Sequence, residues 1–463
     1  MRQQELEERT IRCSTEMLPD VQQPSLCLFD ELPNLDYRDV GTHNNELSAF
    51  VIYDGLVYDI TAFLHLHPGG KSILLPALGT DITDTLASFH DVYVSRLLGS
   101  GQYQQQYGIR IVGKLACAAS GGNNRIGLYE YQSRREYRRP DAMGAELKKE
   151  VFAYLHEAKL PREKPLANCL FLLVFFYGLY CVGVYMAFIR GSALWCLLLG
   201  PIATFAAVNV AHTVMHGGFS NSKIVNLLGR TLWDLGGYSS CSWDIEHQSH
   251  HQAPHTTIDA QTAGASVVRF FKHQEFKWYH RYQMFYIWFA FIFYSPNSWV
   301  IHSYNTLYRY ECVPLSDKMR HVGAKAVGFV LPITLSFQFF DTRTAFRNLF
   351  LFALSMSYFS LFTLFIQHED SYLPEDEAEP WSVRQVATSS TWYTSNFVLE
   401  WLLGYFNYHT EHHLFPGLNP ALYPKIQPIV RSVCERHGVA YKHISYFELV
   451  RSQLRAWRKF SLG

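Results

Sequence analysis

The segments HTVMH (212–216), HQSHH (247–251) and HTEHH (409–413) organise this chain of 463 residues. Residues three and four apart share one face of a helix, so each segment would present its histidines as one stripe if it is helical. A single HxxxH pair is often no more than two surface histidines. Three clusters with recurring spacing, beside long apolar runs, predict a metal site at the edge of a membrane.

The overall composition excludes several classes of protein. The formal net charge is zero, so no global field favours nucleic acid or an anionic surface as a partner. The nine cysteines are scattered without a CxxC pair, which favours reduced thiols and argues against a cysteine-based zinc site. The polar N-terminus, MRQQELEERTIRC, predicts no secretory signal peptide.

Four apolar segments are long enough to cross the hydrocarbon core, which predicts a multi-pass α-helical membrane protein: Leu166–Phe188, Ala193–Ala211, Val322–Phe340 and Asn348–Gln367. The aromatic segment Tyr282–Tyr294 is short for a span, so we expect it at the interface or in a re-entrant role.

The number of spans decides on which face the histidines lie. With four spans, all three clusters and the N-terminus share one face, whereas with five they could not. The short loops at 190 and 341–347 carry few positive charges, and the cluster side carries many, including Lys148, Lys149, Arg269, Lys272, Lys277, Arg281, Lys318 and Arg320. The positive-inside rule then puts the clusters and both termini in the cytosol.

Composition divides the chain into four parts. Residues 1–34 are polar and are expected to be a flexible extension, and residues 35–118 form a compact module. Residues 119–160 combine a Gly/Ser/Asn-rich linker with an amphipathic juxtamembrane helix at 144–160. Residues 161–463 are the membrane domain, in which 224–237 predicts a further amphipathic helix.

The compact module at 35–118 carries several short motifs in a fixed order. The segment AFVIYDGLVYDIT (49–61) predicts a hairpin around Asp54-Gly55 and is followed by HPGG at 67–70, a helical stretch from Thr80-Asp81 to His90, and a strand at 109–115. These residues resemble a cytochrome b5 domain, and that resemblance implies an α+β fold in which His67 and His90 are the axial ligands of heme b. Two imidazoles would fill both axial coordination positions of the iron, so such a haem passes electrons and does not bind oxygen.

The histidine clusters carry more ligands than one ion needs. Imidazole suits iron, zinc or copper, and eight or nine imidazoles imply two metal ions. Over residues 165–450 the pattern HxxxH, HxxHH, HxxHH resembles the membrane fatty acid desaturase superfamily. The resemblance implies a cytosolic di-iron cap with a ninth ligand after the last span, where His368 matches, and an orienting asparagine at Asn407. The implied ligands are His212, His216, His247, His250, His251, His368, His409, His412 and His413.

Further matches are typical of front-end desaturases, which insert a double bond between an existing one and the carboxyl end. They are His216-Gly217-Gly218, the fused haem module, EHHLFP (411–416) and YPKIQP (423–428). Three positions depart from that pattern: His409 stands where glutamine is usual, Thr213 where aspartate is common, and His255 where asparagine is usual. For His255 we favour a polar role over that of an extra ligand.

The resemblance implies an O2-dependent desaturase in the endoplasmic reticulum that acts on a fatty acyl chain carried by CoA or a lipid. Two electrons per turnover would come from the fused haem, itself reduced by cytochrome b5 reductase. A lipid hydroxylase and a sphingolipid long-chain-base desaturase are alternatives with the same architecture. A membrane-anchored haem electron carrier is the non-enzymatic alternative, but an anchor needs only one span and no histidine clusters.

Overall fold

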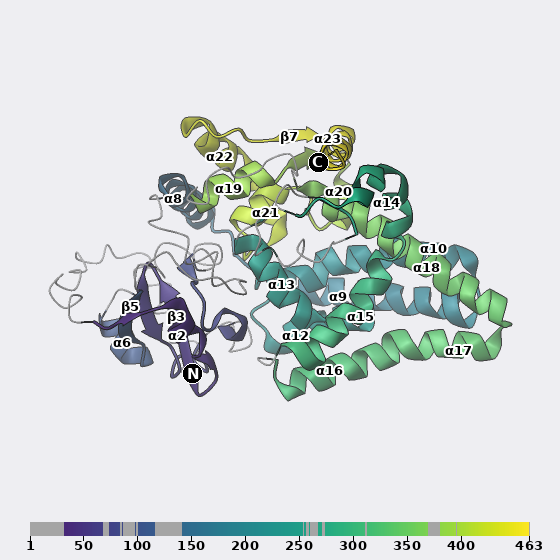
Figure 1. Ribbon diagram of the computed structural model, residues 1–463, viewed down its shortest axis with the longest axis horizontal. Helices are drawn as coiled ribbons and strands as arrows, with labels where there is room; N and C mark the ends of the chain where they lie inside the picture. Colours follow the sequence, from purple (N-terminus) through teal and green to yellow (C-terminus); the bar gives the residue numbers. More distant parts are fainter. Residues whose placement is uncertain are drawn as a thin grey trace.

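The computed structural model describes residues 32–67, 74–83, 86, 98, 101–115, 141–252, 254–255, 259, 267–270, 274–310, 313–368, 380–394 and 396–462. The predictions of a flexible N-terminal extension, of a flexible linker start and of His90 as a haem ligand therefore fall almost entirely outside the described residues. Within them the chain has three parts: an N-terminal α+β module, a bundle of long helices, and a helical cap over one end of the bundle (Figure 1).

The N-terminal module is built on a five-stranded sheet in the order β1-β5-β4-β3-β2. Its core contains Val51, Tyr58 and Leu64. The elements are β1 (Asn34–Leu35), α2 (Tyr37–Gly41), β2 (Asn44–Asn45), β3 (Ser48–Tyr53), β4 (Leu56–Asp59), the 3-10 helix η2 (Leu75–Ala77), α6 (Gly101–Tyr107) and β5 (Arg110–Leu115).

The predicted hairpin is present. Strands β3 and β4 pair antiparallel from Phe50 opposite Asp59 to Tyr53 opposite Leu56. Asp54 and Gly55 connect them with φ of 50° and 78°. Positive φ at both turn residues is what a tight two-residue hairpin requires, and an Asp-Gly pair adopts it readily.

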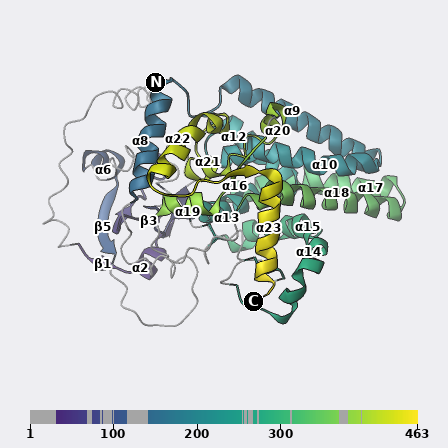
Figure 2. The same ribbon diagram turned by 90° about the horizontal axis from the view of Figure 1, so that it is seen from above.

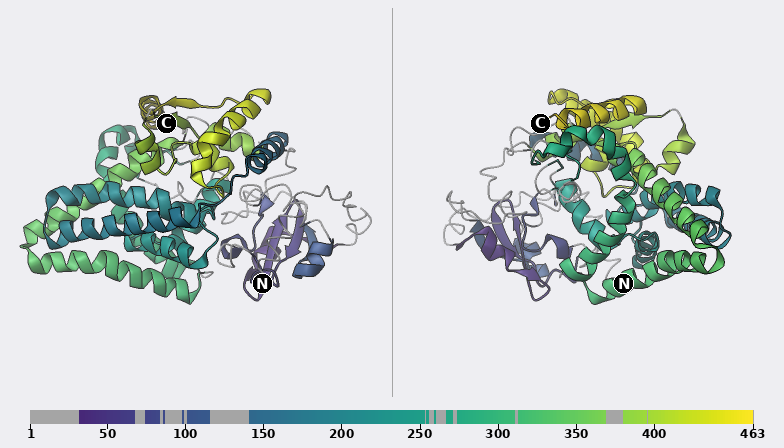
Figure 3. Two further views of the ribbon diagram at one scale, coloured as in Figure 1. Left: turned by 180° about the vertical axis from the view of Figure 1, so that it is seen from behind. Right: turned by 45° about the vertical axis from the view of Figure 1, so that its right-hand side comes forward.

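Four helices are long and apolar enough to cross a membrane, as predicted. They are Leu166–Ile189 (α9 Leu166–Val184 and the π-helical turn η3 Tyr185–Ile189), Ala193–Met215 (α10 Ala193–Ala206, the π-helical turn η4 Ala207–Ala211 and α11 His212–Met215), Leu315–Phe339 (α16 Leu315–Lys325, the π-helical turn η7 Ala326–Val330 and α17 Leu331–Phe339) and Thr342–Thr363 (α18). They lie side by side and extend away from the N-terminal module (Figures 1 and 3).

The helices that contain the third and fourth predicted spans begin before the apolar segments do. The third helix begins at Leu315 rather than Val322, because the charged side chain of Arg320 pairs with the buried Asp234 and does not end the helix. The fourth begins at Thr342 rather than Asn348, because the Asp341 side chain caps it by accepting the Thr344 N–H at 3.0 Å.

The second and fourth spans make the closest contact in the bundle. A Cβ atom at Gly200 would lie 2.6 Å from the Met356 backbone nitrogen, so only glycine allows this approach. The predicted aromatic segment Tyr282–Tyr294 forms one short helix, α14 (Gln283–Phe291). A second helix, α15 (Tyr294–Tyr304), and the π-helical turn η6 (Asn305–Arg309) follow it. Phe285 and Phe289 are exposed on α14.

The cap joins segments from before, between and after the spans (Figure 2). The predicted amphipathic helices are α8 and α12, and Leu147 and Val151 of α8 pack on Ile426 and Val430 of α22. Its elements are α8 (Ala142–Glu157), α12 (Lys223–Leu235), α13 (Ser240–Gln252), η5 (Trp278–Tyr282), η8 (Phe365–Gln367), α19 (Trp381–Thr388), β6 (Thr391–Tyr393), α20 (Phe397–Leu402), α21 (His409–Leu414), η9 (Pro420–Leu422), α22 (Tyr423–Arg436), β7 (His443–Ser445) and α23 (Tyr446–Phe460).

Candidate metal centre

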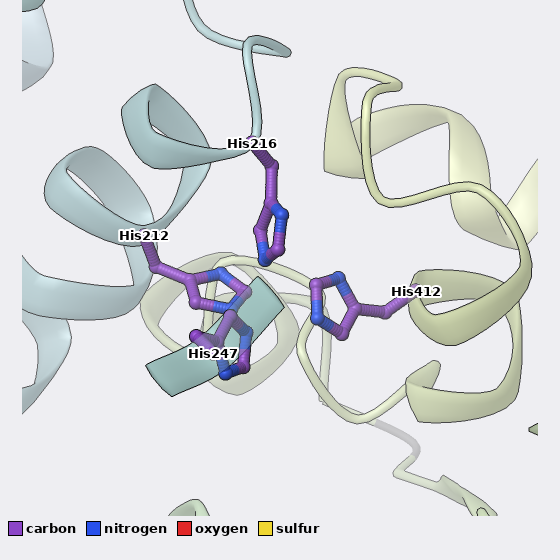
Figure 4. A group of neighbouring side chains, drawn as sticks. All are labelled: His212, His216, His247 and His412. Carbon is purple, nitrogen blue, oxygen red and sulfur yellow. The ribbon is translucent and has the colours of Figure 1, made fainter. Parts of the chain in front are cut away.

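Four histidines from three distant segments converge where the second span enters the cap. His212 and His216 come from the end of that span, His247 from α13 and His412 from α21, and their rings face one another (Figure 4). One ring nitrogen of each lies within 4.8 Å of the others. The Nε2 atoms of His212 and His247 are 3.1 Å apart.

A π-helical turn sits directly before the first of these ligands. In η4 the backbone bonds reach one residue further than in an α-helix, and the N–H of His212 donates to the carbonyl of Ala207. A side chain also bonds to this turn: the Thr213 hydroxyl donates to the Val208 carbonyl at 3.2 Å. Single π-helical turns inside α-helices are frequent at functional sites.

A second group of histidines lies beside the first. His250, His368 and His413 place one nitrogen each within 4.8 Å of the others. The Nε2 atom of His368 is 2.9 Å from Nε2 of His250 and 2.9 Å from Nε2 of His409. His251 adjoins the first group, with its Nε2 3.0 Å from Nε2 of His247. All nine predicted ligands therefore lie in one cluster, although they come from residues 212–413.

The cluster has the donor geometry that a pair of cations needs. Imidazole nitrogens bind first-row ions at about 2.1 Å, so two of them at right angles on one ion stand about 3 Å apart, as the Nε2 pairs do. The Nε2 atoms of His412 and His413 are buried and have no hydrogen-bond partner among the described residues. Burial lowers the pKa of the His247, His412 and His413 rings well below the usual value, so these rings are neutral donors. The residues therefore fit two metal ions.

Outer partners fix which nitrogen of three rings faces the cluster. The Nδ1 atoms of His250, His413 and His368 lie 2.9 Å from Asp259 Oδ2, 2.8 Å from Gln385 Oε1 and 3.2 Å from the Thr388 carbonyl. These oxygens only accept, so each Nδ1 carries the proton and each Nε2 keeps a lone pair for a metal.

Asp259 is the one charged group among these partners, and the sequence did not predict its contact with His250. Burial alone would raise the pKa of its carboxyl, but the His250 ring and the His255 backbone N–H hold it below the ordinary value. A buried carboxylate bonded to the far side of a histidine orients the ring and makes it a more basic ligand. Its position in the sequence, beyond the HQSHH segment, carries no helical spacing that would have pointed to this contact.

The two remaining predicted residues occupy distinct places. Asn407 is buried, its amide donates to the Trp392 carbonyl at 3.0 Å, and no hydrogen bond joins it to a histidine ring within the described chain. His255 is buried with a φ of 63°, a conformation that few residues other than glycine and asparagine adopt. Its ring centroid is 5.4 Å from that of His368, but it joins neither group of four or three.

An apolar cavity lies next to the cluster in the bundle. Its wall includes Ala207 and Ala211 of the π-helical turn, which ends one residue ahead of His212. The lining residues are Tyr180, Ala203, Ala206, Ala207, Ala211, Leu232, Trp233, Gly236, Tyr238 and Met356. The small side chains on one helix and the aromatic rings among the other lining residues make the wall of this pocket largely apolar.

In the N-terminal module only the first predicted haem ligand is described. The His67 ring packs edge-on against Phe63, with ring centroids 5.7 Å apart. Phe63 belongs to the module core with Leu64 and Leu75. Ligation of haem by His67 and His90 stays a prediction.

Comparison with known proteins gives two matches along the chain. Residues 190–445 match the fatty acid desaturase family, and residues 36–112 match the cytochrome b5-like haem/steroid binding domain.

Individual relatives cover most of the chain. An acyl-lipid (8-3)-desaturase of Physcomitrium patens is 24% identical over 92% of this chain and 91% of its own length. An sn-1 linoleoyl-lipid 6-desaturase of Arthrospira platensis is 28% identical over 69% of this chain and 92% of its own. Fatty acid desaturase 3 of Bos taurus is 23% identical over 92% of this chain and 94% of its own length.

Proposed function

Because the chain belongs to the fatty acid desaturase family and carries a cytochrome b5-like domain, we propose that it is an O2-dependent fatty acyl desaturase with two iron ions held by its histidines. The observation that carries the proposal is the convergence of His212, His216, His247 and His412 beside His250, His368 and His413. His251 and His409 complete the proposed ligand set through their Nε2 contacts.

Two bound iron ions with dioxygen would supply the oxidising power to remove one hydrogen from each of two neighbouring CH2 groups. The overall reaction balances when two further electrons and two protons join dioxygen and the two hydrogens to give two waters. The protein's part is to hold and orient the ligands through Asp259, Gln385 and Thr388, and to keep bulk water away from the buried site.

We assign the apolar cavity to the acyl chain. Its wall follows Ala203, Ala207 and Ala211, which share one face of the helix that leads to His212. A chain lying along this face would bring a methylene to the proposed ligands without any polar contact. The aromatic rings of Tyr180 and Tyr238 would bound the chain elsewhere in the cavity.

The finer parts of the proposal rest on the sequence motifs and on the relatives. The front-end motifs and the acyl-lipid substrates in the names of the Physcomitrium and Arthrospira relatives favour a new double bond on the carboxyl side of an existing one, in an acyl chain carried by a lipid or CoA. A haem held by His67 and His90 would deliver the electrons after reduction by cytochrome b5 reductase. The proposed location is the endoplasmic reticulum, with the histidine clusters and both termini in the cytosol.

The test is expression of the full chain in a host that makes no polyunsaturated fatty acids, with a library of fed acyl and sphingoid chains. Wild type should yield a new double bond and hold two irons per chain. His216→Ala and His413→Ala, one from each group, should abolish the product and lower the iron content, because each removes a ligand of a different ion. His437→Ala, an exposed histidine at the end of α22, is the matched control and should change neither.

The proposal fails if wild type gives no new double bond, or if both cluster variants keep full activity. A product that carries a new hydroxyl group in place of the double bond would identify the chain as a lipid hydroxylase. A double bond confined to sphingoid bases would change the substrate class.

A further inference from the structure

One buried hydrogen bond joins the N-terminal module to the metal-cluster helix. The side-chain amide Nε2 of Gln252 donates to the backbone carbonyl of Asp81 at 2.8 Å. Both residues are nearly inaccessible to solvent, with 8% and 7% of their surface exposed. The contact joins two residues that are 171 positions apart in the sequence. The N-terminal module lies on the side of the molecule where α12 and α13 are found (Figures 1 and 3).

On the module side, the contact point belongs to the rigid core. Asp81 forms a parallel bridge with Ile52 of β3, and the Ile82 N–H donates to the Ile52 carbonyl at 2.8 Å. Ile82 packs on the core cluster that contains Phe63, the residue whose ring contacts His67. Asp81 and the segment that carries His67 therefore belong to neighbouring parts of one packed core.

On the cap side, the contact point is continuous with the proposed ligands. Gln252 ends α13 and directly follows His250 and His251. The His251 carbonyl accepts hydrogen bonds from Trp381 Nε1 at 3.2 Å and from Gln385 Nε2 at 2.9 Å. The end of this helix is thus fixed, so Gln252 is presented to the module in one position.

We infer that Gln252 is a positioning residue that docks the haem module on the metal-cluster helix for electron transfer within the chain. The inference rests on the proposed function. In each transfer, ferrous haem loses one electron and becomes ferric, and a ferric ion of the metal pair gains it and becomes ferrous. Two transfers serve each new double bond. A covalent tether alone only raises the effective concentration of the donor, whereas a docked module also keeps one orientation relative to α13.

Burial is what separates docking from a chance surface contact. A glutamine amide in water exchanges one partner for another at little cost, whereas the loss of a hydrogen bond between two buried groups is not made good by water. The acceptor is a backbone carbonyl, so a change of the Asp81 side chain does not remove it. Gln252 is therefore the side of the contact that mutation can test.

The experiment compares Gln252→Met with wild type in the haem- and iron-loaded full chain. Methionine keeps the length and neutral charge of the side chain but has no donor. Gln106→Met, the same change at an exposed position on α6 of the N-terminal module, is the matched control. Three quantities are measured: hydrogen exchange of the segments 79–83 and 248–252, the rate at which prereduced haem is reoxidised after addition of O2 and an accepted acyl substrate, and iron per chain.

In Gln252→Met we expect about tenfold faster exchange in both segments and about tenfold slower haem reoxidation, from the loss of one buried hydrogen bond. Iron content and the rate of haem reduction by an external reductant should match those of wild type and Gln106→Met. Unchanged exchange, or faster exchange with an unchanged rate of reoxidation, overturns the inference. Loss of iron from Gln252→Met also overturns it, because the residue would then support the metal cluster and not the docking.

A failure of the proposed function looks different. In that case O2 and acyl substrate would leave the wild-type haem reduced, while the exchange comparison would still report whether Gln252 holds the module on α13.

Discussion

At the scale of single residues, the orientation of the histidine rings depends on partners that the motif does not contain. Asp259 is fully buried and lies 2.9 Å from His250 Nδ1. Asp259→Asn would keep the shape but could present its NH2 group to the ring, which favours the wrong tautomer. We expect iron affinity about 10- to 100-fold weaker, as is typical for such outer partners, and a similar loss of desaturation. Iron titration of the stripped protein measures this.

The control for this substitution is Glu435→Gln, a carboxylate-to-amide change on the exposed face of α22. It should bind iron as wild type does. If Asp259→Asn binds iron equally well, the carboxylate does not orient His250.

Lys164 predicts a pH dependence of stability. It precedes the first span, its Nζ donates to Asn419 Oδ1 at 3.1 Å, and burial lowers its pKa to about 8. The unfolded chain, with a lysine pKa of about 10.4, binds the proton more tightly than the folded chain. Between about pH 8 and pH 10.4 the unfolded chain holds this proton and the folded chain does not. The free energy of unfolding therefore increases over this range, by on the order of 3 kcal/mol.

Lys164→Met removes this titration. Thermal midpoints of the solubilised chain are measured between pH 7 and pH 10. As the pH rises, the midpoint of wild type should increase relative to that of the variant. The difference between the two curves cancels the titration of other groups. A constant difference across this range would mean that the amine stays solvated in the folded chain.

Sequence alone predicted the residue types of the site better than their contacts. The recurring HxxxH and HxxHH spacing identified the histidines that gather in one cluster, because helical periodicity acts locally. Asp259 and Gln385 were missed, since each meets its histidine only through tertiary folding. The contact between Gln252 and Asp81 is of the same kind: no local pattern reports a bond between two domains.

At the scale of elements, the second span is tied to the segment that leads into the third histidine cluster. Asn209 lies in the π-helical turn, is 3% exposed, and its amide donates to the Phe205 carbonyl at 3.1 Å and to the Leu402 carbonyl at 2.7 Å. Gly404 approaches the same turn so closely that a Cβ atom there would lie 3.1 Å from the Val208 carbonyl. These contacts fix the turn that precedes His212 against the segment that precedes His409.

Asn209→Leu should destabilise the chain by about 1–3 kcal/mol, because it removes the donor of the partly buried Leu402 carbonyl. We expect a lower thermal midpoint and a lower iron content after purification. Asn297→Leu, on the exposed side of α15, provides the same change without a buried partner and should be neutral. Equal midpoints for the two variants would contradict the role of Asn209 as a clamp.

The existence of the spans was predictable, and their ends were less so. Apolar runs longer than about eighteen residues rarely occur outside membrane-spanning helices, and all four predicted spans were found. Their ends depend on capping and ion pairing: Asp341 starts the fourth helix, and Asp234 neutralises Arg320 near the start of the third. Hydropathy does not register such polar contacts, so it identifies the apolar part of each helix but not the residue at which the helix begins.

At the scale of the whole molecule, the four spans bring every proposed ligand to one end of the bundle. The second span ends at Met215 within the first cluster, and the fourth ends at Thr363, shortly before His368. The N-terminal module meets α13 at this same end through Gln252. An even number of crossings is the condition for this arrangement, because an odd number would separate the third cluster from the first two.

The arrangement predicts which segments a protease can reach in sealed microsomes whose cytosolic face is outward. Epitope tags at both termini should be digested, because the module and the cap lie at the cluster end. A tag inserted between Phe340 and Asp341, at the opposite end of the third and fourth spans, should be protected until detergent is added. A digested 340/341 tag with protected termini would invert the orientation, and a split between the two termini would show an odd number of crossings. Since the haem module and the ligands must share one compartment for electrons to pass between them, that last result would also exclude electron transfer within the chain.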